Sequence, residues 1–360
     1  MLKVCVVTTS LALGGAERSS GLLSKMLYGL GYNVHVVITK NQIDYTYSGQ
    51  LFNLEKELNG REGNRLKVKI LKAYFNTHKF DYIIDNRVHN GFLKEFLLYR
   101  YVFRGSKIIT VVRSCNIATY IPKQKVLARL MLGGVNKFVA VSNGIKTEIQ
   151  HRYGFKNVVR IYNPVEVPTT PQEQDEIPLN DKYILFFGRI EERSKNLSLL
   201  IAGYKASKLP KNNIKLVILG TGPDLRRTKE QVNGNGLQKH VLFKPFVANP
   251  YPYIRAALFT VLTSHYEGFP RAVIESLAVG TPVVSVDCKS GPSELITNGY
   301  NGLLVKNHDV NALFKAMDAF VENTKMYNFC KKNAQQSVRH LQVEKIALHW
   351  KKILTNNEKS

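Results

Sequence analysis

The sequence predicts an α/β protein with two doubly wound domains, each built around a parallel sheet. Short runs rich in Val and Ile alternate with amphipathic stretches of helical length, which is typical of strand-helix-strand units. The 360 residues exceed what one hydrophobic core usually holds. Because ligands bind beyond the carboxyl ends of parallel strands, we expect the two domains to face each other across a cleft.

The expected strands fall into two sets, separated by a proline-rich segment. The first set is 3–9, 33–39, 81–86, 107–113, 137–142 and 158–162, and the second is 183–188, 215–219, 240–246, 257–263, 282–287 and 302–305. Residues 164–182 carry several prolines and an acidic run, which indicates a linker. The sequence therefore predicts one domain over residues 1–163 and a second over 183–340.

The C-terminal segment has the pattern of one further amphipathic helix. Its apolar face would contain Val338, Leu341, Ile346, Leu348, Trp350 and Ile353. We expect this helix to span about residues 341–356 and to have a structural role.

Composition and charge narrow the class of protein. The chain has 51 Lys and Arg against 27 Asp and Glu, a net charge of +24, which indicates an anionic partner. Its four cysteines are widely separated, so the sequence predicts neither a disulfide framework nor a zinc site. No apolar run reaches the roughly 18 residues of a membrane-spanning helix, and no signal-peptide pattern opens the chain. We expect a cytoplasmic protein.

Two glycine turns follow expected strands. Gly14 and Gly15 precede a helix whose first N–H groups suit a phosphate, although a tight turn would also require glycine. The turn 220–223 reads Gly-Thr-Gly-Pro, and Pro223 breaks the dinucleotide-binding fingerprint. We therefore reject a nicotinamide cofactor.

Two cations lie at the opening of the second domain. Arg189 follows the strand 183–188, and Lys195 lies at the start of the next expected helix. A cation there opposes the helix dipole unless an anion is bound, which favours an anionic ligand. A salt bridge to Glu191 or Glu192 is the alternative.

The stretch 264–282 is the most informative part of the sequence. Pro270 suits the first position of a helix and Gly280 the residue beyond its end, which predicts a helix over about 270–279. Glu267 precedes this helix, and Glu275 lies roughly 7 to 8 Å along it from Pro270. The two carboxylates flank an anion site. A ligand with a central diphosphate and a hydroxylated ring at each end would fit all these features.

These elements together resemble glycosyltransferase family 4, whose members are retaining enzymes of the GT-B fold, with two facing Rossmann-like domains. The resemblance rests on the E-x7-E element, the 188–197 segment, the Gly-Thr-Gly-Pro turn and the early Gly-Gly-Ala-Glu-Arg. It covers nearly the whole chain and is strongest over 183–305. It implies that the C-terminal helix crosses back to the first, acceptor-side domain, while the second domain binds a nucleotide sugar.

The resemblance also implies residue roles. Glu275 would bind the ribose hydroxyls, and Glu267 would hold the donor sugar. Arg189 and Lys195 would neutralise the diphosphate, so the implied catalytic residues are Arg189, Lys195 and Glu267. Further donor-binding residues would be Gly15, Gly222, Gly268, Phe269 and Pro270. No metal and no cofactor is expected, because two cations and a helix N-terminus can replace a metal ion.

Three more residues are expected near the acceptor or the sugar. Arg113 stands where the family often has a His, and since Arg cannot act as a base at neutral pH, it is an electrostatic contact or part of an altered acceptor site. Asn163 precedes Pro164, as in the family pattern. His265 either lines the cleft or makes a structural hydrogen bond. The other histidines, His89 among them, show no spacing that indicates metal binding.

We therefore expect a retaining glycosyltransferase that uses a nucleotide diphosphate sugar, foremost a UDP-sugar. It would move a hexose or N-acetylhexosamine to a lipid-linked or oligosaccharide acceptor in bacterial cell-surface polysaccharide synthesis, such as that of lipopolysaccharide or capsule. A sugar-nucleotide epimerase on the same scaffold and a basic nucleic-acid-binding protein are the alternatives. No nucleic-acid motif is present, so we expect no nucleic-acid partner.

One basic segment suggests that the enzyme binds its acceptor at a membrane. Residues 92–104 alternate apolar and aromatic residues with cations at helical spacing, and Lys123, Lys125 and Arg129 follow on a second amphipathic stretch. We interpret them as an anionic-lipid contact, which would place the enzyme at the inner face of the cytoplasmic membrane. A core helix with snorkelling Lys and Arg stems is the alternative.

Overall fold

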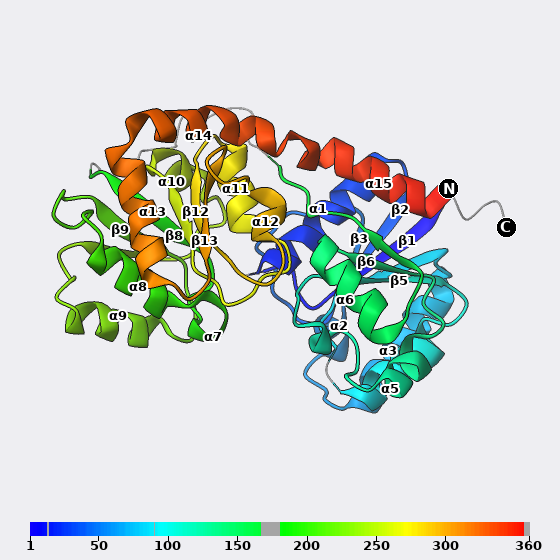
Figure 1. Cartoon of the computed structure of the whole chain (residues 1–360). Coiled ribbons are helices and arrows are strands. Elements are labelled where there is room, and N and C mark those ends of the chain that lie inside the picture. Colours follow the sequence, from blue (N-terminus) through cyan, green and yellow to red (C-terminus); the bar gives the residue numbers. More distant parts are fainter. Residues whose placement is uncertain (13, 90, 167–180, 356–360) are drawn as a thin grey trace. The chain divides into compact units, whose positions relative to one another are not determined.

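The structure is a computed structural model, and it describes residues 1–12, 14–89, 91–166 and 181–355 (Figure 1). The chain divides into two compact units. Unit 1 contains Met1–Pro164 and Val343–Ser360, and unit 2 contains Val165–Gln342. Most of the expected linker, residues 167–180, lies outside the described residues.

Unit 1 is built around a seven-stranded parallel sheet with the order β3-β2-β1-β4-β5-β6-β7. The strands are β1 (Lys3–Thr8), β2 (Asn33–Ile38), β3 (Gln50–Asn53), β4 (Tyr82–Asp85), β5 (Lys107–Val112), β6 (Lys137–Ala140) and β7 (Val158–Arg160). The order reverses between β1 and β4, the switch point of a doubly wound sheet. The predicted architecture of this half is confirmed.

Strand β3 is one that the sequence pattern does not predict. It is a short edge strand, and three of its four residues are exposed or half-buried. It therefore lacks the apolar run that marks the central strands of a parallel sheet.

The helices of unit 1 cover both faces of its sheet (Figure 1). They are α1 (Gly15–Gly29), α2 (Leu54–Leu58), α3 (Asn64–His78), α4 (Phe92–Leu97), α5 (Lys125–Leu132), α6 (Asn143–Tyr153) and α15 (Val343–Thr355), with a π-helical turn η1 (Leu98–Val102) and a 3-10 turn η2 (Ile117–Thr119). The C-terminal helix α15 packs against α1, and the hydroxyl of Tyr82 donates to the carbonyl of Leu354 at 2.8 Å. On α15, Ile346 and Trp350 are buried, but Leu348 is exposed, so the predicted apolar face is wrong at that position.

Unit 2 is a second parallel sheet, with six strands in the order β10-β9-β8-β11-β12-β13. The strands are β8 (Tyr183–Phe187), β9 (Lys215–Leu219), β10 (Val241–Lys244), β11 (Thr260–Leu262), β12 (Val283–Asp287) and β13 (Gly302–Lys306). The helices are α7 (Glu192–Lys195), α8 (Leu197–Ala206), α9 (Leu225–Gly234), α10 (Tyr251–Ala256), α11 (Arg271–Ala278), α12 (Pro292–Leu295), α13 (Val310–Glu322) and α14 (Thr324–Ser337), with a 3-10 turn η3 (Arg339–Leu341). The strand order reverses between β8 and β11.

Alternate residues of β8 show how the second sheet is covered. Ile184 and Phe186 belong to one apolar cluster, which includes side chains of α8, α9 and α13. Tyr183 and Leu185 point to the opposite face and pack with residues of α10. Because successive side chains of a strand point to opposite faces, a strand buried on both faces has a continuous apolar run. Within the described residues, no helix has the length and apolarity needed to cross a membrane.

Candidate functional site

The end of β8 positions Arg189 and Lys195. Arg189 follows the strand closely, and its side chain is 66% exposed, with its Nε 4.0 Å from a carboxylate oxygen of Glu191. Lys195 is the last residue of the short helix α7, and Asn196, in the left-handed conformation, begins α8 as its N-cap. Lys195 therefore ends the single turn α7, where a cation suits the dipole, and it also lies directly before the N-cap of the ten-residue helix α8, at the start of the helix that the sequence predicted.

Lys195 forms an ion pair with a residue far away in the sequence. Its Nζ lies 2.7 Å from Oε1 of Glu267, and the hydroxyl of Ser264 donates to the same oxygen at 2.7 Å. The carboxylate partner is thus Glu267 and not the neighbouring Glu191 or Glu192. Strands β8 and β11 are adjacent in the sheet, which brings the segments after them together. The side chains of Lys195 and Glu267 remain 23% and 12% exposed, so they are accessible to a ligand.

Helix α11 carries a second ion pair. Nη2 of Arg271 lies 2.8 Å from Oε1 of Glu275, one turn further along, and both side chains are at least nine-tenths buried. Pro270, the predicted first residue, is the N-cap of this helix, which begins one position later at Arg271, and it has no side-chain group that could cap the first N–H groups. Sequence reasoning missed Arg271, although its i, i+4 spacing from Glu275 is the usual signal of such a pair.

The glycine-rich turns have clear packing reasons. A Cβ on Gly222 would lie 2.1 Å from the carbonyl oxygen of Ile190, so this turn requires glycine whether or not a ligand binds. The carbonyl of Gly268 accepts a hydrogen bond from the hydroxyl of Ser290 at 3.0 Å. Phe269, next to it, is buried. Gly15 is exposed at the first position of α1 in unit 1.

His265 is held mainly through its backbone. Its N–H donates to the carbonyl of Ser194 at 3.0 Å, and its ring lies 5.1 Å from that of His308. The hydrogen bond joins the segment after β11 to α7. His265 therefore lies beside the Lys195–Glu267 pair in sequence and is half-buried.

In unit 1, the structure brings Arg113 and Asn163 together. Nη1 of Arg113 donates to Oδ1 of Asn163 at 2.6 Å, while its Nε and Nη2 donate to Oδ1 of Asn86 at 3.2 and 3.0 Å. These residues follow β5, β7 and β4, so Arg113 is clamped at the carboxyl edge of the sheet. Sequence reasoning missed Asn86.

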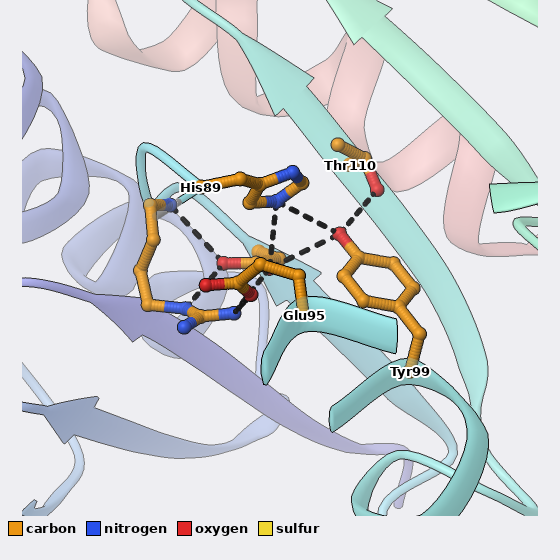
Figure 2. Close-up of polar contacts among 6 residues, drawn as sticks. His89, Glu95, Tyr99 and Thr110 are labelled. Atoms are coloured by element: carbon orange, nitrogen blue, oxygen red, sulfur yellow. Dashed lines mark hydrogen bonds and ion pairs between the residues drawn. The ribbon is translucent and has the colours of Figure 1, made fainter. Parts of the chain in front are cut away.

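A buried polar network lies at the same edge (Figure 2). Arg87 joins Asp85 and Glu95 through its Nη2, at 2.8 and 3.0 Å. The hydroxyl of Tyr99 lies 3.1 Å from Oδ2 of Asp85 and 2.9 Å from the hydroxyl of Thr110. Burial alone would raise the pKa of Asp85, but the charge of Arg87 and the contact with His89 hold it well below its usual range. Asp85 is therefore ionised inside unit 1.

This network includes a set of side chains that could ligate a metal ion. One ligand atom each of Asp85, His89 and Glu95 lies within 4.8 Å of the others. However, the guanidinium of Arg87 already lies between the two carboxylates, in the place that a cation would take. The spacing of His89 gave no sign of these partners, because Glu95 comes from α4 and only the fold brings it to the end of β4.

The chain is similar to known glycosyltransferases. Residues 169–337 match the model of glycosyl transferases group 1. The chain is 28% identical, over 96% of its length and 98% of the relative, to an N-acetylgalactosaminyltransferase of Campylobacter jejuni, named for an N-acetylgalactosamine-N,N'-diacetylbacillosaminyl-diphospho-undecaprenol acceptor. It is 30% identical to a lipopolysaccharide 1,6-galactosyltransferase of Salmonella typhimurium, over 46% of this chain and 47% of that protein.

Solved structures show the same fold. HepE of Anabaena, in complex with UDP-glucose, has a TM-score of 0.82 at 18% identity, with 99% of this chain and 100% of HepE covered. TarM of Staphylococcus aureus, in complex with UDP, has a TM-score of 0.82 at 14% identity, with the same coverage. The two parallel sheets and these similarities lead to one conclusion. The chain has the GT-B fold of these glycosyltransferases, and its residues 169–337 match the glycosyl transferases group 1 model.

Proposed function

We propose that this enzyme transfers a hexose or N-acetylhexosamine from a UDP-sugar to a lipid-linked glycan, with retention of the anomeric configuration and without a metal ion. The Lys195–Glu267 pair carries this proposal. The pair lies at adjacent strand ends of unit 2, where parallel sheets bind ligands, and it offers one cation and one carboxylate.

The donor would use the two members of the pair differently. The diphosphate binds the ammonium of Lys195. Arg189 and the N-terminus of α11, which has no side-chain cap, supply further positive charge. The carboxylate of Glu267 accepts hydrogen bonds from the donor sugar. Glu275, held by Arg271, takes the ribose hydroxyls. Cations and helix N–H groups that are already in place stabilise the charge that develops on the leaving diphosphate.

A polyprenyl-linked acceptor is supported by the name of the Campylobacter jejuni relative, whose similarity spans nearly the whole of both chains. The structure adds a surface suited to lipid, which we call the α4–α5 surface. Its exposed apolar residues are Leu93, Leu97, Tyr101, Val126 and Leu130, and its exposed cations are Lys94, Arg100, Arg104, Lys125 and Arg129. Exposed apolar side chains and exposed cations within the same segments suit an anionic membrane surface. The enzyme would thus work from the cytoplasmic side as a peripheral membrane protein.

The two helices of this surface are joined. Helices α4 and α5 are in contact, and Nη2 of Arg100 donates to the carbonyl of Leu130 at 2.8 Å. The alternate side of the same segment, including Leu98, Tyr99 and Phe103, is buried. The segment is therefore buried on one side and exposed on the other, which leaves the exposed side available to lipid.

A donor screen tests the proposal. Purified enzyme is mixed with UDP-glucose, UDP-galactose, UDP-N-acetylglucosamine or UDP-N-acetylgalactosamine, and its melting temperature is measured. A ligand at about 100 times its dissociation constant stabilises by roughly 2.7 kcal/mol. The stabilising donor is then incubated with N-acetylgalactosamine linked to farnesyl diphosphate, and NMR of the product identifies the anomer. No stabilisation by any UDP-sugar, or an inverted product, would contradict the proposal.

A further inference from the structure

His89 is held firmly at the carboxyl edge of the unit 1 sheet. Its backbone N–H donates to the carbonyl of Thr119 at 2.8 Å, which joins the segment after β4 to η2. Its Nε2 lies 3.4 Å from Oδ2 of Asp85 and 3.3 Å from the hydroxyl of Tyr99. The side chain is 6% exposed. Figure 2 shows these contacts at one ring nitrogen and none at the other.

The partners of Nε2 determine the chemistry of the second nitrogen. Asp85 is ionised, so its oxygens can only accept hydrogen bonds, and Nε2 must carry a proton to lie beside them. In the neutral ring, Nδ1 then holds a lone pair that faces outward from the network. A carboxylate that fixes the tautomer of a histidine in this way prepares the opposite nitrogen to receive a hydrogen bond.

Nδ1 of His89 is buried and has no hydrogen-bond partner among the described residues. Nδ2 of Asn86, three residues earlier, is in the same condition, and Asn86 is 3% exposed. Its amide orientation is fixed, because its Oδ1 accepts two hydrogen bonds from Arg113. Buried polar groups are nearly always paired, so two open groups at one strand end indicate a ligand.

We infer that Nδ1 of His89 and Nδ2 of Asn86 bind the hydroxyl groups of the sugar acceptor. A hydroxyl donates one hydrogen bond and accepts others, so a polyhydroxylated ring satisfies an acceptor at Nδ1 and a donor at Nδ2. The site lies beyond the carboxyl ends of β4 and β5, the edge where parallel sheets bind ligands. The inference rests on the proposed function, since it assigns the acceptor side of that same reaction.

A metal ion fits this position less well. The lone pair of Nδ1 faces away from the two carboxylates, and Arg87 neutralises both of them. A neutral hydrogen-bond donor of a ligand therefore suits Nδ1 better than a metal ion does. Tyr120 is a neighbour of His89, with the two ring centres 6.5 Å apart. Burial raises the pKa of Tyr120 to about 12, against the charge of Arg113, so it stays a neutral hydroxyl.

A matched pair of variants separates acceptor binding from a structural role. In His89→Asn, the amide oxygen can occupy the place of Nδ1, but the contact with Asp85 is lost. In His89→Gln, the amide nitrogen reaches the place of Nε2 and keeps the contact with Asp85, but nothing replaces Nδ1. We expect His89→Gln to raise KM for farnesyl-diphosphate-linked N-acetylgalactosamine about tenfold, the scale of one lost hydrogen bond, and His89→Asn to raise it less.

Donor binding is the control. The dissociation constant of the UDP-sugar and its slow hydrolysis without acceptor should stay within about twofold in both variants, because the contacts of His89 and those of the Lys195–Glu267 pair share no residue. If His89→Asn impaired acceptor KM as much as or more than His89→Gln, or if neither changed it, the inference would be overturned, and Nδ1 would hold only a buried water. If the wild-type enzyme bound no UDP-sugar, the proposed function would fail instead.

A measurement on the wild-type protein does not depend on the variants folding. In ¹⁵N-histidine-labelled enzyme, Nδ1 of His89 should shift on addition of N-acetylgalactosamine at tens of millimolar, while Nε2 stays close to its original position. The signal is assigned by its absence from His89→Gln, or by its persistence in the other single-histidine variants. No shift at Nδ1 would overturn the site, whatever the transfer assay shows.

Discussion

The two sheets of this enzyme place charge at their carboxyl ends in opposite ways. In unit 1, Asp85, Arg87 and Glu95 are almost completely buried and bonded to one another. In unit 2, Lys195 and Glu267 form a single pair that remains partly exposed, and Arg189 is mostly exposed. The sheets are similar, but unit 1 has a buried charge network at its strand ends and unit 2 has a solvent-accessible ion pair.

This difference indicates different tasks. A buried charge without a partner costs several kcal/mol, so the members of the unit 1 network hold each other and fix the segments after β4 and β5. A pair that still contacts solvent can exchange its partner for a ligand at a smaller cost. We therefore expect mutations of the network to act on the stability of unit 1 and mutations of the pair to act on turnover.

The largest expected effect comes from Arg87→Met. It would leave the carboxylates of Asp85 and Glu95 buried without a cation, which costs about 3 to 5 kcal/mol of the free energy of unfolding. The single tryptophan, Trp350, is buried in unit 1, so its fluorescence during urea denaturation follows this unit. As a control, Arg226→Met removes an exposed pair with Glu230 and should change stability by less than about 0.5 kcal/mol. Equal losses of unfolding free energy in the two variants would contradict the expected difference between buried and exposed ion pairs.

The second effect concerns the accessible pair. Lys195→Ala should raise the barrier to sugar transfer by roughly 2 to 4 kcal/mol, the scale for one preorganised charge contact with a leaving group. Arg189→Ala should cost less, because its side chain is 66% exposed and its contact with Glu191 is long. Steady-state kinetics with the preferred UDP-sugar measure both. A Lys195 variant with unchanged kcat, or an Arg189 variant with the larger loss, would reverse this ranking.

The third effect is a pH dependence confined to unit 1. Burial, with smaller contributions from the charges of His78 and Lys3, lowers the pKa of His35 from 6.5 to about 4. Its Nδ1 lies 2.6 Å from the hydroxyl of Tyr74, which can donate only to the neutral ring. Between pH 6.5 and 4, the unfolded state binds a proton that the folded ring does not, so stability falls as the pH falls.

The slope in this window should approach about 1.4 kcal/mol per pH unit, and it should shrink in His35→Gln, which can still accept from Tyr74. Trp350 fluorescence in urea at several pH values measures it. Asp85 adds a loss at lower pH, because its folded pKa is held below the unfolded value near 3.9 and its contribution disappears as the pH falls below about 4. A flat profile between pH 6.5 and 4 would contradict the His35 assignment.

The fourth effect is on membrane binding through the α4–α5 surface. Each cation near an anionic surface contributes roughly 1 kcal/mol, so Lys94→Ser, Arg104→Ser and Lys125→Ser together should weaken binding to vesicles that contain phosphatidylserine. Salt should weaken the wild-type binding as well. Vesicle co-sedimentation measures both effects, with neutral phosphatidylcholine vesicles as the control. Equal binding to both vesicle types would show that the surface serves another purpose.

The smallest expected effect is that of a chelator. If Lys195, Arg189 and the start of α11 supply the positive charge for the leaving diphosphate, transfer should continue at an unchanged rate in EDTA. Loss of activity with rescue by Mg²⁺ or Mn²⁺ would show that the accessible pair is not sufficient.

Much of the fold follows from local patterns. The predicted strand 215–219 has the same bounds as β9, because a central parallel strand reads as an uninterrupted apolar run. The edge strand β3 has no such run and is not predictable in this way. The resemblance to glycosyltransferases was also detectable in the sequence, because the residues that carry it lie close together in the stretches 188–197 and 267–275.

What the sequence by itself determined is therefore the order of the central strands and the residue types at their ends, since both depend on neighbours along the chain. Only the tertiary structure decided which of those residues meet. Lys195 pairs with Glu267, 72 residues away, because β8 and β11 lie side by side, and not with the nearer Glu191 or Glu192. His89 acquires Asp85 and Tyr99 as partners because β4 and the π-helical turn η1 are packed together in the interior. Burial and strand order are properties of the whole chain, so they are absent from any single segment of the sequence.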